Sequence, residues 1–128
     1  MTSDISNISE SYQKFMKFIE MPVDNRIKES KKIRSLYPDR VPVVVYTVKN
    51  TGIPDNDKIK YLVPLVLTLG QFQFVVRKRS KIESEKAMFM CIDGNILPQS
   101  STIDSIYDEY KNDDGFLYIS ISGENTFG

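Results

Sequence analysis

The strongest strand signal in the chain is the run Val41-Pro42-Val43-Val44-Val45-Tyr46-Thr47-Val48. Residues branched at Cβ pack well on a pleated surface, and an apolar run of such residues is typical of a strand in the middle of a sheet. We therefore predict a central β-strand over residues 41–48. Turn-forming residues follow in Asn50–Asp57. Lys58–Pro64 then alternates well enough to predict a second, antiparallel strand.

Two helices are predicted before the central strand. The first starts at Ser9 or Ser11, either of which can act as its N-cap, and its apolar residues recur at helical spacing: Tyr12, Phe15, Met16, Phe18 and Ile19. The break Met21-Pro22-Val23 ends this helix. The second helix is predicted from Asp24, acting as its N-cap, to about Leu36.

Helices and strands continue to alternate beyond the predicted hairpin. We predict a helix capped by Thr68 and reaching about Arg79, followed by a strand over Ala87–Ile92. The turn Asp93-Gly94 then leads to a short strand at Ile96-Leu97. A helix capped by Ser101 or Thr102 and a last strand over Phe116–Ile121 complete the predicted order. The inward face of the first of these helices is predicted to hold Leu69, Phe72, Val75 and Val76. Two helices followed by ββαββαβ describe a β-grasp, which is an α+β fold.

The composition excludes several classes of function. The 128-residue chain has no histidine and one cysteine, Cys91, so it lacks His-based catalysis, an internal disulfide and a Cys/His metal site. We therefore expect no enzyme activity, no metal and no cofactor. Seventeen basic residues balance seventeen acidic ones, which argues against binding to nucleic acid by bulk charge. No apolar run is long enough to span a bilayer, so membrane attachment would have to be added to the chain.

The chain ends in Ser122-Gly123-Glu124-Asn125-Thr126-Phe127-Gly128, directly after the last predicted strand. A terminal glycine has no Cβ, so its carboxylate can pass through a narrow enzyme channel to be activated and transferred. We predict that residues 122–128 form a flexible conjugation tail. Residues 24–121 are predicted to form the folded domain, and residues 1–23 a separate segment with the short amphipathic helix.

Four blocks of sequence make the chain similar to the autophagy-related ubiquitin-like modifiers of the GABA-receptor-associated-protein (GABARAP) family. They are Lys32-Ile33-Arg34 with Tyr37–Val43, Lys60–Pro64 with Leu67–Phe72, Val76–Arg79, and Asp114–Tyr118 with the Phe127-Gly128 end. The resemblance covers about Asp24 to Gly128. It implies a ubiquitin-like β-grasp with two additional N-terminal helices.

The resemblance implies that Gly128 is joined covalently to phosphatidylethanolamine by dedicated activating and conjugating enzymes. The chain would then be cytoplasmic before conjugation and attached to autophagosome or vesicle membrane after it. A cysteine protease that processes or delipidates such proteins is an expected partner. Cargo receptors and adaptors are expected to bind through a Trp/Phe/Tyr-x-x-Leu/Ile/Val peptide, and nucleic acid is not an expected partner.

The expected peptide site lies at the predicted strand Lys58–Pro64, which would form a sheet edge open to a further strand. By resemblance, the pocket for the aromatic residue is lined by Glu29, Ile33, Pro42, Lys60, Leu62 and Phe116. The pocket for the aliphatic residue is lined by Tyr61, Val63, Pro64, Leu67, Phe72, Val75 and Val76. Arg40, Lys58 and Arg79 would surround the groove with positive charge and favour acidic residues beside the peptide motif.

Other interpretations of these residues stay open. Apolar positions such as Ile33, Leu62, Phe72 and Val75 are more often simply core. The basic cluster Arg77–Lys81 is usually a solvated helix end. A protein that binds peptides without being conjugated, or a modifier of protein lysines, would have much the same sequence. We expect Cys91 to be an inert core thiol.

Three features depart from the family pattern. Pro64-Leu65-Val66-Leu67 is apolar where relatives usually carry a small residue and Asp. Tyr46 replaces a common acid. The segment Met1–Val23 diverges most, and its helix can pack on the domain, contact membrane or mask the groove; packing is the favoured role.

Overall fold

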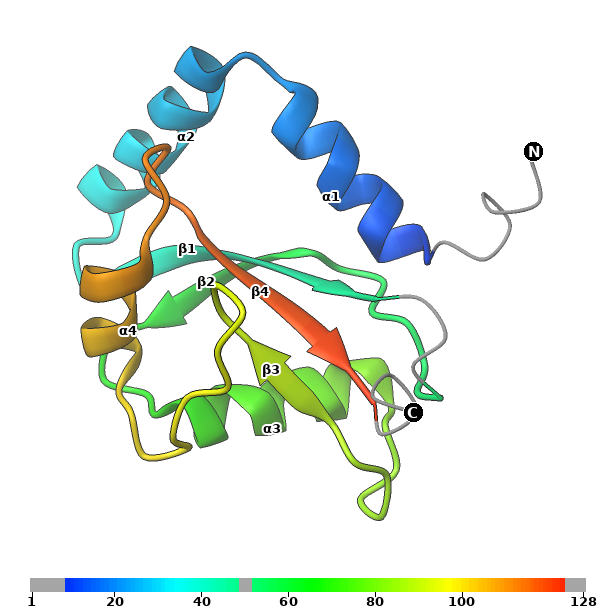
Figure 1. Cartoon of the computed structure of the whole chain (residues 1–128). Helices are drawn as coiled ribbons and strands as arrows, with labels where there is room; N and C mark the ends of the chain where they lie inside the picture. Colours follow the sequence, from blue (N-terminus) through cyan, green and yellow to red (C-terminus); the bar gives the residue numbers. More distant parts are fainter. Residues whose placement is uncertain (1–8, 49–51, 124–128) are drawn as a thin grey trace, which may run out of the picture.

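The computed structural model describes residues 9–48 and 52–123, which form four helices and four strands (Figure 1). In chain order the elements are α1 (Glu10–Glu20), α2 (Val23–Leu36), β1 (Arg40–Thr47), β2 (Lys60–Pro64), α3 (Leu69–Ser80), β3 (Phe89–Cys91), α4 (Ile103–Tyr110) and β4 (Leu117–Ser122). The fold is the predicted α+β type, with two helices ahead of the first strand. Gly128 and the rest of the predicted tail beyond Gly123 lie outside the described residues, as do residues 1–8.

The sheet is mixed, with strand order β2-β1-β4-β3. The two central strands, β1 and β4, run parallel, and Val44 lies opposite Tyr118. The strands β2 and β3 pair antiparallel at the two edges, with Val43 opposite Tyr61 in the first pair. β1 is therefore the predicted central strand, and β2 is the predicted edge strand.

The sheet is covered on both faces, as Figure 1 shows. Val41, Val43 and Val45 point into the main core, which they share with α3 and α4. Val44 points to the other face, into a smaller core with Phe18 of α1 and Phe116. This alternation explains why the run at residues 41–45 is apolar without interruption.

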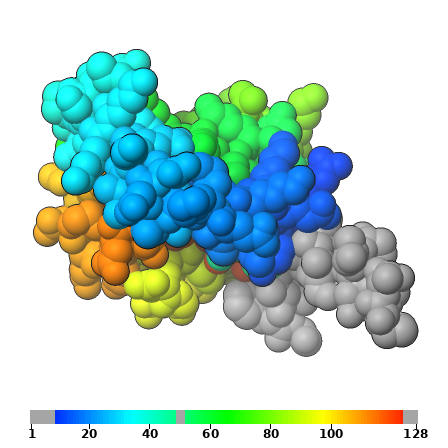
Figure 2. Space-filling view, turned by 90° about the horizontal axis from the view of Figure 1, so that it is seen from above, coloured from blue at the N-terminus to red at the C-terminus, as the bar shows by residue number. Residues whose placement is uncertain are grey.

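Packing of α1 on the domain, the role favoured for this helix, is confirmed. The buried Ser11 accepts a hydrogen bond from the Thr47 backbone N–H (2.8 Å), and its hydroxyl donates to Asp55 (2.6 Å). Phe15 stacks on Tyr46, with ring centroids 4.0 Å apart. Seen from above, α1 and α2 lie across one face of the molecule (Figure 2).

The helix starts follow local capping rules at three of four positions. Ser9 caps α1, Thr102 caps α4, and Thr68 forms a capping box with Gln71 at the start of α3. The Asp24 cap predicted for α2 is wrong. That helix starts one residue earlier, after Pro22, so Asp24 lies in the first turn, where its charge complements the helix dipole.

Two other expectations are corrected by the structure. The predicted strand at Ile96-Leu97 does not form, so the order is ββαβαβ among the described residues, with only an isolated bridge between Ile92 and Asn95. Asp93 and Gly94 both have positive φ and turn the chain tightly, and Ile96 is 55% exposed with no core to join. Cys91 is not fully buried, because it lies on the short edge strand β3.

Val75 was predicted to face inward but is 45% exposed. The buried stripe of α3 runs through Leu69, Phe72 and Val76. Because each helical residue turns by about 100°, Val75 points well away from that stripe.

Candidate functional site

The candidate site is the outer edge of β2. Among the described strands, β2 pairs only with β1, so its other edge is available to a further strand. Successive side chains of a strand point to opposite faces. Lys60 points toward α1 and α2, where it meets Glu29 and Phe18. Tyr61 points toward α3, where its ring lies 5.5 Å from that of Phe72. The predicted pockets therefore lie on the two faces of one strand.

On the α2 side, two of the predicted aromatic-pocket residues, Lys60 and Glu29, are in direct contact. The Lys60 ammonium lies 2.8 Å from the Glu29 carboxylate and 4.5 Å from the centre of the Phe18 ring. Ile33 and Leu62 are half-buried, whereas Pro42 and Phe116 are buried. Those two residues can form the floor of a pocket but not its walls.

Phe18 belongs to this group and was missed as a site residue. Its ring lies 4.9 Å from that of Phe116, in an edge-to-face arrangement, and only 5% of the residue is exposed. The sequence signal for Phe18 was the apolar stripe of the first predicted helix. That stripe indicates that one face of the helix is buried, but it does not identify the residues against which this face packs.

On the α3 side, the predicted aliphatic-pocket residues separate into two groups. Val63, Phe72 and Val76 are part of the main core, and Tyr61 is nearly buried. Pro64 and Leu67 are half-buried and Val75 is exposed, so these three remain accessible at the surface. The spacing of these residues in the sequence did not distinguish the core positions from the surface positions.

A hollow of about 760 Å³ lies between β2 and α3, and we refer to it as the β2–α3 hollow. Besides Tyr61, Leu62 and Val75, its lining includes Asp57, Lys58, Phe74, Lys78 and Arg79. Phe74 and Lys78 were not predicted as site residues. The Lys78 ammonium lies 5.5 Å from the centre of the Phe74 ring, and this pairing at i and i+4 was readable from the helix prediction.

The predicted groove charges are all near this edge. The Lys58 ammonium lies 4.8 Å from the centre of the Tyr61 ring, and Arg79 Nε lies 3.5 Å from Asp57 Oδ1. Arg40, at the start of β1, directs a long contact of 3.5 Å to the Leu62 carbonyl of β2. Burial raises the pKa of Tyr61, and the nearby Arg79 charge partly opposes that rise.

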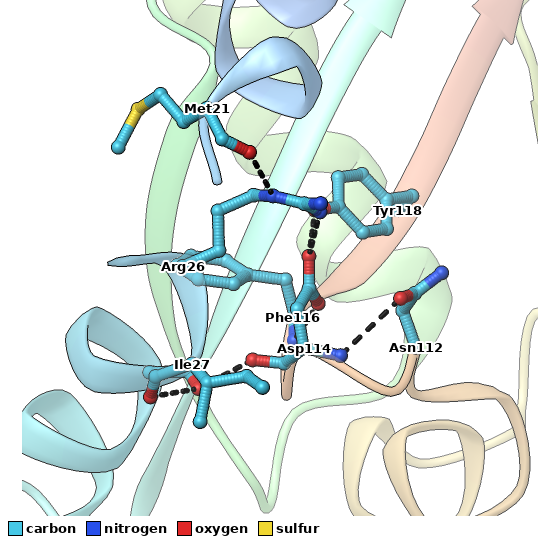
Figure 3. Close-up of polar contacts among 8 residues, drawn as sticks. Met21, Arg26, Ile27, Asn112, Asp114, Phe116 and Tyr118 are labelled. Carbon is cyan, nitrogen blue, oxygen red and sulfur yellow. Dashed lines mark hydrogen bonds and ion pairs between the residues drawn. The ribbon is translucent and has the colours of Figure 1, made fainter. Parts of the chain in front are cut away.

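The position of Glu29 depends on how α2 is anchored to the sheet (Figure 3). Arg26 donates a hydrogen bond to the Asp114 carboxylate at 2.9 Å, and the Tyr118 hydroxyl donates to the same carboxylate. One turn further along α2, the Ser30 hydroxyl donates to the Asp114 carbonyl. These contacts hold α2 over the turn before β4 and so place Glu29 beside Lys60.

The comparisons with known proteins agree with this architecture. A family model described as "Autophagy protein Atg8 ubiquitin like" matches residues 25–128. The chain belongs to the Atg8 family. It is 50% identical over 110 residues to autophagy-related protein 8a of Arabidopsis thaliana, covering 86% of this chain and 90% of that one. It is also 50% identical over 109 residues to autophagy-related protein 8 of Lodderomyces elongisporus, covering 85% and 75%.

A solved structure supports the assignment at the level of the fold. The crystal structure of Trypanosoma brucei ATG8 superimposes with a TM-score of 0.78 at 40% identity, covering 83% of this chain and 91% of that one. The chain is therefore an autophagy-related ubiquitin-like modifier, and lipid conjugation is the known role of the Atg8 family. In the described ranges, no helix is long and apolar enough to cross a bilayer. The same ranges contain no group of three side chains suited to holding a metal ion.

Proposed function

We propose that this Atg8-family chain is conjugated through the Gly128 carboxylate to phosphatidylethanolamine and so becomes anchored on autophagosomal membrane. The observation that carries the proposal is the family match, which runs through to residue 128 and includes the terminal glycine. Each methylene group of an attached acyl chain that enters the bilayer contributes about 0.8 kcal/mol to membrane binding. Two acyl chains would therefore hold the protein on the membrane, although no helix among the described residues could span it. The chain would be cytoplasmic before this step.

We further propose that the edge of β2 binds partners with an aromatic-x-x-aliphatic peptide. The free edge offers main-chain groups for a further strand, and apolar side chains flank it on both faces. Expected partners are cargo receptors and adaptors, the activating and conjugating enzymes, and a processing cysteine protease. In this proposal the chain is not itself an enzyme and needs no cofactor. Within the Atg8 family, we place it in the GABARAP group.

Conjugation is tested by the intact mass of the protein recovered from membranes of its own starved cells. We expect a form heavier by one phosphatidylethanolamine in the wild type and none in Gly128→Ala. Thr126→Ala changes the same segment but keeps Gly128, and should be conjugated normally. An unmodified but functional protein would favour the adaptor that is never conjugated. Larger adducts on protein lysines would favour the protein modifier.

Peptide binding is tested with a tryptophan-containing peptide, because the protein itself has no tryptophan and the signal comes from the peptide alone. We expect Lys60→Glu and Leu62→Ala to weaken binding by about tenfold, the loss of one central apolar or charged contact. Val66→Ala is a suitable control, since Val66 is 84% exposed and lies after β2. Equal binding by all variants would place the site elsewhere.

A further inference from the structure

We infer that the outer side of α3, at its C-terminal end, docks on an anionic membrane surface once Gly128 carries a lipid. In this arrangement Arg77, Lys78 and Lys81 contact the oxyanions of lipid headgroups. The ring of Phe74 enters the interface between headgroups and acyl chains. The inference rests on the conjugation proposed above, which brings the chain to a membrane but does not determine which side of the domain meets it.

A hollow of about 630 Å³ lies on this side of α3, and we refer to it as the α3-end hollow. Its lining consists of Phe74, Arg77, Lys78, Lys81, Ile82 and Ser84. Three of these residues are cations, and none of the described residues that line the hollow is an acid. Glu83 and Glu85 are exposed in the turn that follows, but neither lines the hollow. Its charge therefore favours an anionic ligand.

The helix places an aromatic ring among these cations. Phe74, Arg77, Lys78 and Lys81 recur at i, i+3, i+4 and i+7, so they share one side of α3, facing away from its buried stripe. Phe74 is 60% exposed, and the Lys78 ammonium lies 5.5 Å from the centre of its ring. Arg77 donates to two carbonyls of the following turn, at 3.1 and 2.7 Å. An exposed aromatic ring surrounded by basic side chains is typical of a surface that binds anionic lipid.

Lys81 occupies a position that normally favours glycine. It caps the C-terminal end of α3 with φ 57° and ψ 40°, in the left-handed region. A glycine would adopt this conformation without the steric cost of a Cβ, but it would have no charge. The chain therefore has a cation beside the hollow at a position where a neutral glycine would be more stable.

The proposed lipid anchor limits which parts of the domain can meet the membrane. Gly123 is the last described residue, and residues 124–128 can span at most about 18 Å when fully extended. Ser122 of β4 lies opposite Phe89, so the turn that leads from α3 into β3 finishes beside the end of β4. Figure 1 shows the C-terminal end of α3 and the end of β4 at the same end of the molecule. The tether can therefore bring the α3-end hollow to the membrane.

The charges at this end of the molecule favour one side of it. β1 runs parallel to β4 and finishes at the same end, where the Thr47 N–H donates to Ser11 of α1 and the Ser11 hydroxyl donates to Asp55. The exposed acids Glu10 and Asp55 thus lie with α1, on the opposite face of the sheet from α3. An anionic surface attracts the cations of α3 and repels these acids, so the domain should turn its α3 side toward the lipid.

The experiment tethers the full chain to vesicles chemically, so its result does not depend on any conjugating enzyme. Gly128→Cys provides the attachment point for a maleimide phospholipid, and Cys91→Ser removes the natural thiol. Phe74→Trp keeps an aromatic ring and introduces the only tryptophan. On vesicles with about 30% phosphatidylserine, we expect its emission to shift to the blue and to be quenched by brominated acyl chains. On phosphatidylcholine vesicles, or in about 0.5 M salt, both effects should be weak.

Two pairs of substitutions with the same change in charge test the assigned residues. Lys78→Gln with Lys81→Gln removes two cations from the hollow. Because each basic residue near an anionic membrane strengthens binding by about fivefold, the ratio of docked to undocked protein should fall by at least about tenfold. Lys28→Gln with Lys32→Gln removes two exposed cations from α2, on the other face of the sheet, and should change the ratio by less than about twofold.

A single substitution separates the charge of the turn from its stability. Lys81→Gly suits the left-handed conformation, so its melting temperature should equal or exceed that of the parent protein. Its docking should nevertheless weaken by about fivefold, the effect of one cation.

Three results would overturn the inference. Equal fluorescence on neutral and anionic vesicles would show that headgroup charge is not recognised. An equal loss with the α2 pair would show that overall charge, and not one side of the domain, controls docking. Unchanged docking after loss of Lys78 and Lys81 would remove the hollow from the contact. All three leave the conjugation of Gly128 in place, whereas an unmodified mass in cells would reject that conjugation and leave the vesicle result standing.

Discussion

The Arg26 guanidinium and the Asp114 carboxylate form a buried ion pair between α2 and the turn before β4, with Arg26 Nη1 2.9 Å from Asp114 Oδ2. The Asp114 side chain is fully buried, and its other oxygen accepts the Phe116 backbone N–H at 2.8 Å. Because Tyr118 also donates to it, the carboxylate joins α2, the turn and β4 (Figure 3). A buried charge held in this way is favourable only while its partners are present.

Asp114→Asn should lower the free energy of unfolding by about 3–5 kcal/mol, because it leaves the Arg26 charge buried without a counter-charge. Urea unfolding followed by circular dichroism measures the change. Asp113→Asn, at the neighbouring exposed position, should shift the free energy by less than about 0.5 kcal/mol. Equal effects of the two substitutions would show that the buried pair contributes nothing specific.

Stability should fall in alkaline solution because of Tyr118. Burial, then the hydrogen bond to Asp114 and its charge, raise the pKa of Tyr118 above the usual 10.0. Above pH 10 the unfolded chain loses this proton while the folded chain keeps it. The free energy of unfolding therefore falls as pH rises, by up to about 1.4 kcal/mol per pH unit for one such group.

Tyr118→Phe should reduce this alkaline loss, measured as the difference in the free energy of unfolding between pH 8 and pH 11. Some loss should remain, because burial also raises the pKa values of Tyr46, Tyr61 and Tyr107. The prediction fails if the variant and the wild type lose the same free energy over this range.

Gly115→Ala should destabilise the protein much more than Gly94→Ala. Both glycines have positive φ, +89° and +78°, so an alanine is strained at either position. A Cβ at Gly115 would lie 2.3 Å from Ser30 Oγ, whereas a Cβ at Gly94 would meet nothing within 4 Å. We expect a cost of about 1 kcal/mol at Gly94 and at least about 3 kcal/mol at Gly115. Thermal unfolding of the two variants provides the comparison.

Tyr46→Glu should loosen α1 without unfolding the sheet. The ring of Tyr46 stacks on that of Phe15, with ring centroids 4.0 Å apart and an angle of 13° between the ring planes. Losing the stack should cost about 0.5–1.5 kcal/mol beyond the lost burial. Hydrogen exchange should become faster in α1 and stay unchanged in β1 and β4. Unchanged exchange in α1 would mean that Phe18 and Ser11 alone are sufficient to dock the helix.

Much of the fold was predictable because its signals are local. Thr68 and Gln71 form the capping box that starts α3, and both members lie within four residues of each other. The apolar, β-branched run at residues 41–48 predicted a central strand, and β1 lies between β2 and β4 in the sheet. The edge position of the strand was also predicted, and the strand order β2-β1-β4-β3 confirms it.

The candidate site was predictable only as a set of positions. Resemblance named Phe116 and Leu62 for one pocket and Phe72 for the other. It did not show that Phe116 and Phe72 are buried and that Leu62 is half-buried at the edge. Phe74 and Lys78 were missed because their i and i+4 spacing shows that they are neighbours on a helix but not that a hollow lies beside them. The Tyr61 hydroxyl has no hydrogen-bond partner among the described residues. This was also unpredictable, because the groups that pack around a side chain decide whether its hydrogen bonds are made.

The amino-acid sequence alone determined the type and order of nearly every element, because caps, turns and hydrophobic period act between near neighbours. The tertiary structure decided the contacts that shape the site. Arg26 and Asp114 are separated by 88 positions, and Lys60 and Glu29 by 31. Whether such groups meet depends on how whole helices dock on the sheet, and that docking is a collective result of core packing which no local pattern encodes.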